Sequence, residues 1–97
     1  MKGNTMRAYI IVDLTPTNPE KLQRYSAEAS ETIAAFGGQF LAKGPIEALH
    51  GDMPHKMKAI IEFKDRETAK NWYDSAAYQK LVPLRDEGMD SQFHLLG

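Results

Sequence analysis

The spacing of the apolar residues changes from strand-like to helix-like and back in a fixed order along this chain. A strand-like segment covers residues 7–14, and similar segments follow at residues 39–43, 56–63 and 91–96. A helical stripe separates the first two, and a second helical region begins near residue 65. The order β-α-β-β-α-β predicts an α+β fold of the ferredoxin-like kind, a four-stranded antiparallel sheet with its helices on one face.

The first helical segment is marked at both ends. Asn18, Pro19 and Glu20 place an N-cap residue, a first-turn proline and an acid in succession. Gly37 and Gly38 can take the left-handed conformation that ends a helix. Between these signals the apolar residues recur every three or four positions, at Leu22, Tyr25, Ala29, Ile33 and Phe36. This pattern predicts a helix of roughly 18 residues with one buried stripe.

Two further features shape the rest of the chain. Asp65 is predicted to cap a second helix that reaches Tyr73, and Ser75 a short third one that Pro83 interrupts. The pair at 44–45, Gly-Pro, predicts a β-bulge in the second strand.

Size and charge exclude several classes of protein. A chain of 97 residues makes one domain, which we expect to span residues 6–97 behind a flexible lead at residues 1–5. Twelve Lys and Arg against thirteen Asp and Glu give a net charge of -1, which leaves no electrostatic footprint for nucleic acid or an anionic membrane. No apolar run approaches the roughly 20 residues of a membrane span, and no secretory signal is apparent. We expect a cytoplasmic protein.

The second face of the predicted sheet also carries apolar groups. Tyr9 and Ile11 alternate there with Arg7 and Asp13. A single copy would expose this face to water, which soluble monomers rarely tolerate over a large patch. We therefore expect a homodimer in which two sheets pack face to face across a two-fold axis.

The segment from Asn71 to Arg85 concentrates residues that suit a ligand. It contains the only Trp, two of the four Tyr and an Arg. We predict that Tyr73, Tyr78 and Arg85 bind a carboxylate or enolate, because a guanidinium offers a fixed fork of donors. The alternative is a packing seam in which Trp72 is core, each Tyr satisfies a backbone carbonyl, and Arg85 pairs with a nearby acid.

Asp13 and His94 are the other candidates for catalysis, beside Arg85. Asp13 ends the first strand and would be a proton acceptor in an apolar cavity, with Tyr9 as a neighbouring ligand contact. His94, on the last strand, is the best candidate by residue type for a base or a haem ligand. The alternatives are a solvated strand-end acid and an ordinary surface histidine.

No cofactor and no metal are expected. The chain has no cysteine, which excludes thiolate sites. His50, Asp52 and His55 lie in one Gly/Pro turn, but their spacing matches no established metal site.

The order of several segments resembles one known family. These segments are Gly37-Gly-Gln-Phe-Leu-Ala-Lys-Gly44, Leu49-His-Gly-Asp52, Ile61-Glu-Phe63, Trp72-Tyr-Asp-Ser-Ala-Ala-Tyr78 and Pro83-Leu-Arg85. The chain resembles, over nearly its whole length, the family called "domain of unknown function 1330" of the dimeric α+β barrel superfamily. It departs from the family pattern at Gln39, where Arg is common, and at Met53, where an aromatic is common.

The resemblance implies a ferredoxin-like protomer whose sheet pairs with its twin into a barrel. It implies no single reaction, because related proteins include cofactor-free monooxygenases, lactone isomerases and haem enzymes. Two functions stay open. The first is binding of a small aromatic or acidic metabolite in a barrel pocket, with cofactor-independent oxidation or isomerisation. The second is a non-catalytic ligand-binding or stress-response dimer.

Overall fold

Within the described part of the chain, one antiparallel sheet of four strands is the central element of the fold. The computed structural model describes residues 7–97. The strands lie side by side in the order β2-β3-β1-β4. Their bounds are Ala8–Pro16 for β1, Gln39–Pro45 for β2, Met57–Phe63 for β3 and Met89–Leu96 for β4. This order confirms the predicted ferredoxin-like protomer.

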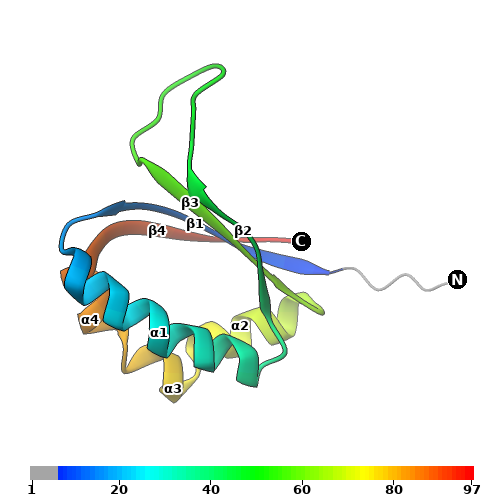
Figure 1. Ribbon diagram of the computed structural model, residues 1–97. Helices are drawn as coiled ribbons and strands as arrows, with labels where there is room; N and C mark the ends of the chain where they lie inside the picture. The colour runs from blue at the N-terminus through cyan, green and yellow to red at the C-terminus, as the bar shows by residue number, and fades with distance from the viewer. Residues whose placement is uncertain (1–6) are drawn as a thin grey trace, which may run out of the picture.

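The part of the chain that the structure describes has four helices. They lie on one face of the sheet (Figure 1). Asn18 caps the first by accepting a hydrogen bond from the Lys21 backbone N–H, and Asp65 caps the second in the same way from Thr68. The predicted third helix is two short ones, because Pro83 starts a new helix instead of breaking one. The helices are α1 (Pro19–Ala35), α2 (Arg66–Asp74), α3 (Ala76–Gln79) and α4 (Val82–Gly88).

Two sequence predictions concern the N-terminal residues and membrane spans. The flexible lead at residues 1–5 and the start of the domain at Met6 lie outside the described residues. Over residues 7–97, no helix has both the length and the apolar character that crossing a membrane requires.

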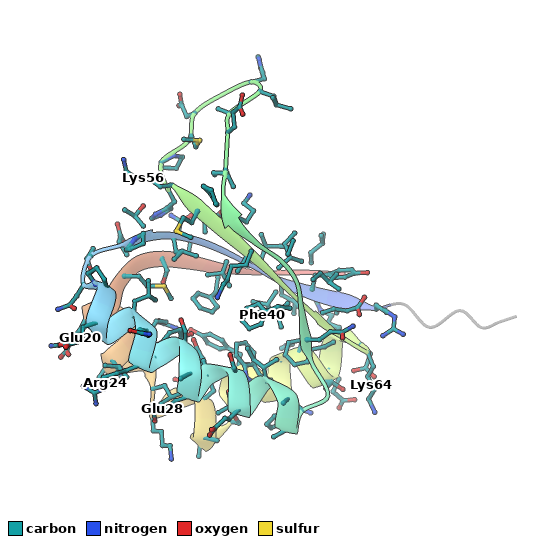
Figure 2. All side chains as sticks on the ribbon, in the orientation of Figure 1. Glu20, Arg24, Glu28, Phe40, Lys56 and Lys64 are labelled. Atoms are coloured by element: carbon teal, nitrogen blue, oxygen red, sulfur yellow. The ribbon has the colours of Figure 1, made fainter. Side chains whose placement is uncertain are left out.

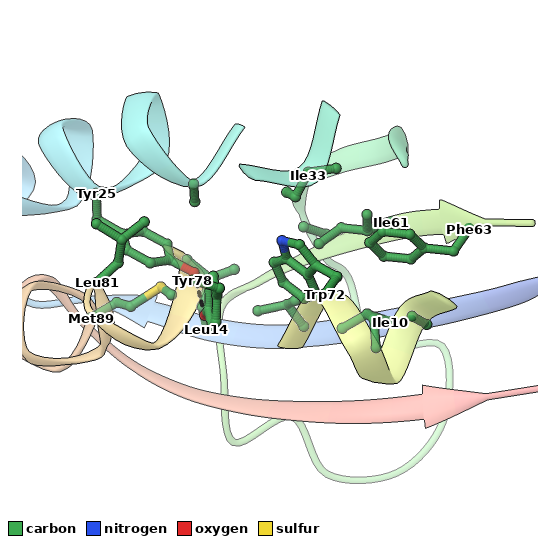
Figure 3. Packing of buried hydrophobic residues seen from close by; sticks show 14 of the residues in the cluster. Ile10, Leu14, Tyr25, Ile33, Ile61, Phe63, Trp72, Tyr78, Leu81 and Met89 are labelled. Atoms are coloured by element: carbon green, nitrogen blue, oxygen red, sulfur yellow. Dashed lines mark hydrogen bonds between the residues drawn. The ribbon is translucent and has the colours of Figure 1, made fainter. Parts of the chain in front are cut away.

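The hydrophobic core lies between the sheet and the helical layer. Along β1, alternate side chains are buried, from Ala8 to Leu14, because successive strand residues point to opposite faces. Trp72 and Tyr78 are fully buried, and their ring centroids lie 4.4 Å apart. Figure 3 shows Trp72 near Ile33, with Tyr78 on one side of the pair and Phe63 on the other. The prediction that Trp72 is a core residue is confirmed.

The β-bulge lies elsewhere than the sequence predicted. Gly-Pro at 44–45 pairs in regular register with β3, whereas the register shifts between Phe40 and Ala42. Leu41 is therefore the extra residue of β2. The bulge determines which face of the sheet the side chains of β2 point to. Phe40 pairs with Ile61 and Lys43 with Ala59, so both side chains face the helices. In a regular strand, residues three apart would face opposite sides.

The connection between β2 and β3 forms an arm at residues 46–56 that rises away from the two layers (Figure 1). A hydrogen bond from the Ile46 backbone N–H to the Lys56 carbonyl, 3.1 Å long, closes its base. Leu49, an apolar residue of this arm, is 93% exposed.

Gly88 allows α1 and α4 to approach closely. A Cβ atom at this position would lie 2.8 Å from the Leu22 backbone nitrogen. The Gly88 carbonyl also accepts hydrogen bonds from the backbone N–H groups of Thr17 and Asn18. The start of α1 thus depends on the absence of a side chain at the end of α4.

We predict that Gly88→Ala lowers the free energy of unfolding by about 1–3 kcal/mol, because the methyl group would push against backbone atoms. Urea denaturation measures this change. Gly44→Ala is the matched control, since nothing lies within 4 Å of its added Cβ, and it should leave stability nearly unchanged. Equal stability of the two variants would contradict the close approach of α1 and α4.

Candidate functional site

A cavity of about 100 Å³ lies between α1 and the sheet. Its walls come from α1, from the inner face of the strands, and from Trp72 of α2. Phe40 and Lys43 are the exposed residues of the lining, so they mark its mouth. Figure 2 shows Phe40 between β2 and the helical layer. The lining residues are Val12, Leu14, Leu22, Tyr25, Ser26, Ala29, Ile33, Phe40, Lys43, Met57, Ala59, Ile61, Trp72, Met89 and Phe93.

Small side chains leave this space open. The α1 stripe carries large residues at Tyr25 and Ile33, but Ser26 and Ala29 between them are small. Ala59 of β3 is the small residue on the sheet side. Bulky groups thus hold α1 away from the sheet at two points, and the small residues between them do not fill the gap.

A network of hydroxyl groups and one guanidinium adjoins the cavity. Tyr25 lines the cavity, and its hydroxyl shares a hydrogen bond of 2.7 Å with the Tyr78 hydroxyl. Arg85 Nη1 donates to the hydroxyls of Tyr73 at 3.0 Å and Tyr78 at 3.3 Å. The guanidinium also lies 5.0 Å from the centroid of the Phe93 ring. Tyr25 and Phe93 therefore connect the cavity wall to Arg85.

Burial controls the protonation of this network. It raises the pKa of Tyr25, and the neighbouring Tyr78 raises it further. Burial also raises the pKa of Tyr78, although hydrogen bonds from Tyr25 and Arg85 offset part of the effect. For Arg85, burial lowers the pKa, but hydrogen bonds to Tyr73, Tyr78 and Asp86 outweigh it and the net pKa is raised. At neutral pH, Arg85 is therefore a fixed cation beside the neutral hydroxyls of Tyr25 and Tyr78.

The structure brings together three predicted ligand-binding residues, Tyr73, Tyr78 and Arg85. Arg85 contacts the hydroxyls of Tyr73 and Tyr78, as the ligand-site prediction expects. It also pairs with Asp86, whose Oδ1 lies 3.0 Å from Arg85 Nε, as the packing alternative expects. None of the three lines the cavity itself. Sequence reasoning missed Tyr25, which stands on the predicted buried stripe like any core residue. Its long-range partner Tyr78, 53 positions away, gave no local signal.

Asp13 and Tyr9 lie on the other face of the sheet. Asp13 pairs with Lys58, their Oδ1 and Nζ atoms 3.1 Å apart, and Tyr9 is half-buried beside Glu62. His94 is exposed on β4, opposite Ile11.

The predicted catalytic residues therefore do not line one cavity. His94 and Tyr73 border a separate shallow depression of about 260 Å³ at the β4 edge. The roles of Asp13, His94 and Arg85 in catalysis stay predictions. The cavity also differs from the expected barrel pocket, since it lies on the helix side of a single sheet.

A buried His55 marks the base of the arm. Its Nδ1 lies 3.1 Å from Thr15 Oγ1, which joins the arm to the end of β1. His50 and Asp52 of the same turn are exposed. This contact gives His55 a structural partner.

The fold and the cavity define a ferredoxin-like α+β protein with an internal apolar site. The chain belongs to the family described as "Domain of unknown function (DUF1330)", whose model matches residues 7–97. No curated protein matches the chain.

Solved structures share the fold at low sequence identity. A protein of unknown function from Rhodopseudomonas palustris is 16% identical with a TM-score of 0.76, over 96% of this chain and 82% of that one. SnoaB from Streptomyces nogalater, a cofactor-independent oxygenase, is 12% identical with a TM-score of 0.69, over 94% and 91%. A dimeric ferredoxin-like protein of unknown function from Jannaschia sp. CCS1 is 13% identical with a TM-score of 0.73, over 95% and 99%.

We predict that Tyr25 and Tyr78 release their protons only as the protein unfolds at alkaline pH. Unfolded tyrosine has a pKa of about 10. Because the folded pKa values of both are raised, the folded state keeps these protons longer. The stability that this gives is complete below pH about 10 and is lost as the pH rises further.

Stopped-flow alkaline jumps followed by tyrosinate absorbance measure this behaviour. A slow phase should coincide with unfolding, and Tyr25→Phe should reduce its amplitude. Tyr9→Phe, on the other face of the sheet, should keep it. Full tyrosinate absorbance before any loss of circular dichroism would refute the buried network.

Proposed function

We propose that this protein binds a small, largely apolar aromatic molecule in the cavity between α1 and the sheet. The observation that carries this proposal is the lining, which is apolar apart from Tyr25, Ser26 and Lys43. Trp72 and Phe93 offer aromatic walls. The volume of about 100 Å³ is close to that of an engineered cavity of roughly 150 Å³ that admits benzene. A single ring is the size of ligand that suits it.

The position of the ionisable groups favours binding without catalysis. No Asp, Glu or His is among the residues that line the cavity within the described range, so an enzyme here would rely on the ligand's own acidity. Cofactor-independent oxidation of the bound ligand is the second candidate. It is supported by the likeness in fold to SnoaB. Oxygen uptake in the presence of a bound ligand separates the two candidates.

We predict that Ala29→Leu weakens ligand binding strongly, because the larger side chain fills the space between α1 and Ala59. Isothermal titration calorimetry with p-cresol and phenylacetamide should give affinity at least about tenfold weaker than that of the unmodified protein. Ala34→Leu makes the same change on the exposed side of α1 and is the matched control. Unchanged binding to the Ala29→Leu variant would sink the proposed site.

The outer face of the sheet is the proposed surface for a homodimer. Tyr9, Ile11 and Ile60 form a half-buried apolar centre there, and Leu96 beside them is 59% exposed. A two-fold axis would let each copy cover this patch on the other. Dimeric proteins of this fold, such as that from Jannaschia sp. CCS1, support the proposal.

We predict that Ile11→Glu converts the dimer into a monomer, because it would place a charge in the centre of a buried interface. Sedimentation velocity reports the mass. Ala34→Glu adds the same charge on the exposed side of α1 and should leave the dimer intact. A monomeric unmodified protein, or a dimer that survives Ile11→Glu, would contradict this surface.

A further inference from the structure

Lys43 brings a positive charge to the mouth of an otherwise apolar cavity. It belongs to the lining together with Phe40, and its Nζ atom lies 5.3 Å from the centroid of the Phe40 ring. Both side chains are exposed, whereas the walls behind them are buried or half-buried. Ligand atoms at this point would meet water and an ammonium group together.

The β-bulge is the reason that Lys43 faces the cavity. Leu41 adds one residue to β2, so Lys43 pairs with Ala59 on the helix side. Without the extra residue, either Phe40 or Lys43 would point to the other face. Bulges often re-aim side chains beside functional sites. The strand thus presents an aromatic ring and an ammonium as one pair.

Among residues 7–97, no carboxylate forms an ion pair with Lys43. The ion pairs among residues 7–97 join Arg7 to Glu62, Lys21 to Glu87, Lys58 to Asp13 and Arg85 to Asp86. No carboxylate in this part of the chain lies within 4 Å of Lys43 Nζ. Inward-pointing lysines also protect edge strands from pairing with other chains, and that role predicts no ligand preference.

We propose that Lys43 makes the cavity selective for aromatic carboxylates, an inference that rests on the proposed function. The ring would occupy the space beside Ala29 and Ala59, and the carboxylate would stay at the mouth beside Lys43. One ammonium matches one negative charge. Since the anion keeps contact with water, its desolvation cost is small, and the ring gains the free energy of burial.

Phenylacetate and phenylacetamide test this selectivity, because they have the same shape and differ in charge. Isothermal titration calorimetry should give about fivefold tighter binding of phenylacetate, as expected for one solvent-accessible ion pair. Lys43→Met should remove the preference by weakening the binding of phenylacetate more than the binding of phenylacetamide. Lys43→Arg should keep it. Lys56→Met, at the exposed base of the arm, is the matched control and should also keep it.

Several outcomes would overturn the inference separately from the proposed function. Equal affinity of the unmodified protein for the two ligands would do so, while sensitivity to Ala29→Leu would still uphold the cavity. A preference that survives Lys43→Met would assign the selectivity to another group. Equal weakening of both ligands in that variant would reduce Lys43 to a packing role on Phe40. Absence of binding of either ligand would overturn both proposals.

Discussion

The contact of Tyr25 with Tyr78 sets the position of α1 over the sheet. The two hydroxyls share a hydrogen bond of 2.7 Å inside the core, and Arg85 donates a second hydrogen bond to the Tyr78 hydroxyl. A buried hydrogen bond of this kind is costly to break, because each hydroxyl would lose its partner away from water. This contact fixes the N-terminal half of α1, and the packing of Ile33 near Trp72 fixes its C-terminal half. The space beside Ala29 stays open because the contacts of Tyr25 and Ile33 keep the helix at this distance from the sheet.

The cavity and its charge have different structural origins. The cavity follows from side-chain size, since Ser26, Ala29 and Ala59 are too small to close the gap between these contacts. The charge follows from backbone geometry, since the extra residue Leu41 turns Lys43 toward the helices. The network of Tyr73, Tyr78 and Arg85 lies outside the cavity lining and contacts it through Tyr25. It holds the shape of the site, whereas the mouth has the groups that a ligand would meet first.

Sequence reasoning predicted the fold well and the site only in part. The alternation of β1 and the caps at Asn18 and Asp65 are local signals, and the order of elements that such signals mark along the chain indicated the ferredoxin-like topology, because few topologies fit that order. The clustering of Tyr73, Tyr78 and Arg85 also followed from their nearness in the chain. The role of Tyr25 in the network was not predicted, because its partner Tyr78 is distant in sequence. The bulge was placed at Gly-Pro 44–45, since a register shift at Leu41 depends on pairing with β3 and leaves no compositional mark.

Both proposals for the cavity require that α1 lies far enough from the sheet to leave an apolar space beside Ala29. Diffraction from crystals pressurised with xenon tests it most directly, because xenon enters dry apolar cavities without needing any particular chemistry. We expect a xenon site between Ala29 and Ala59, beside the Trp72 ring. Crystals in which the side chains of α1 and β3 meet there, and in which no xenon enters, would contradict it.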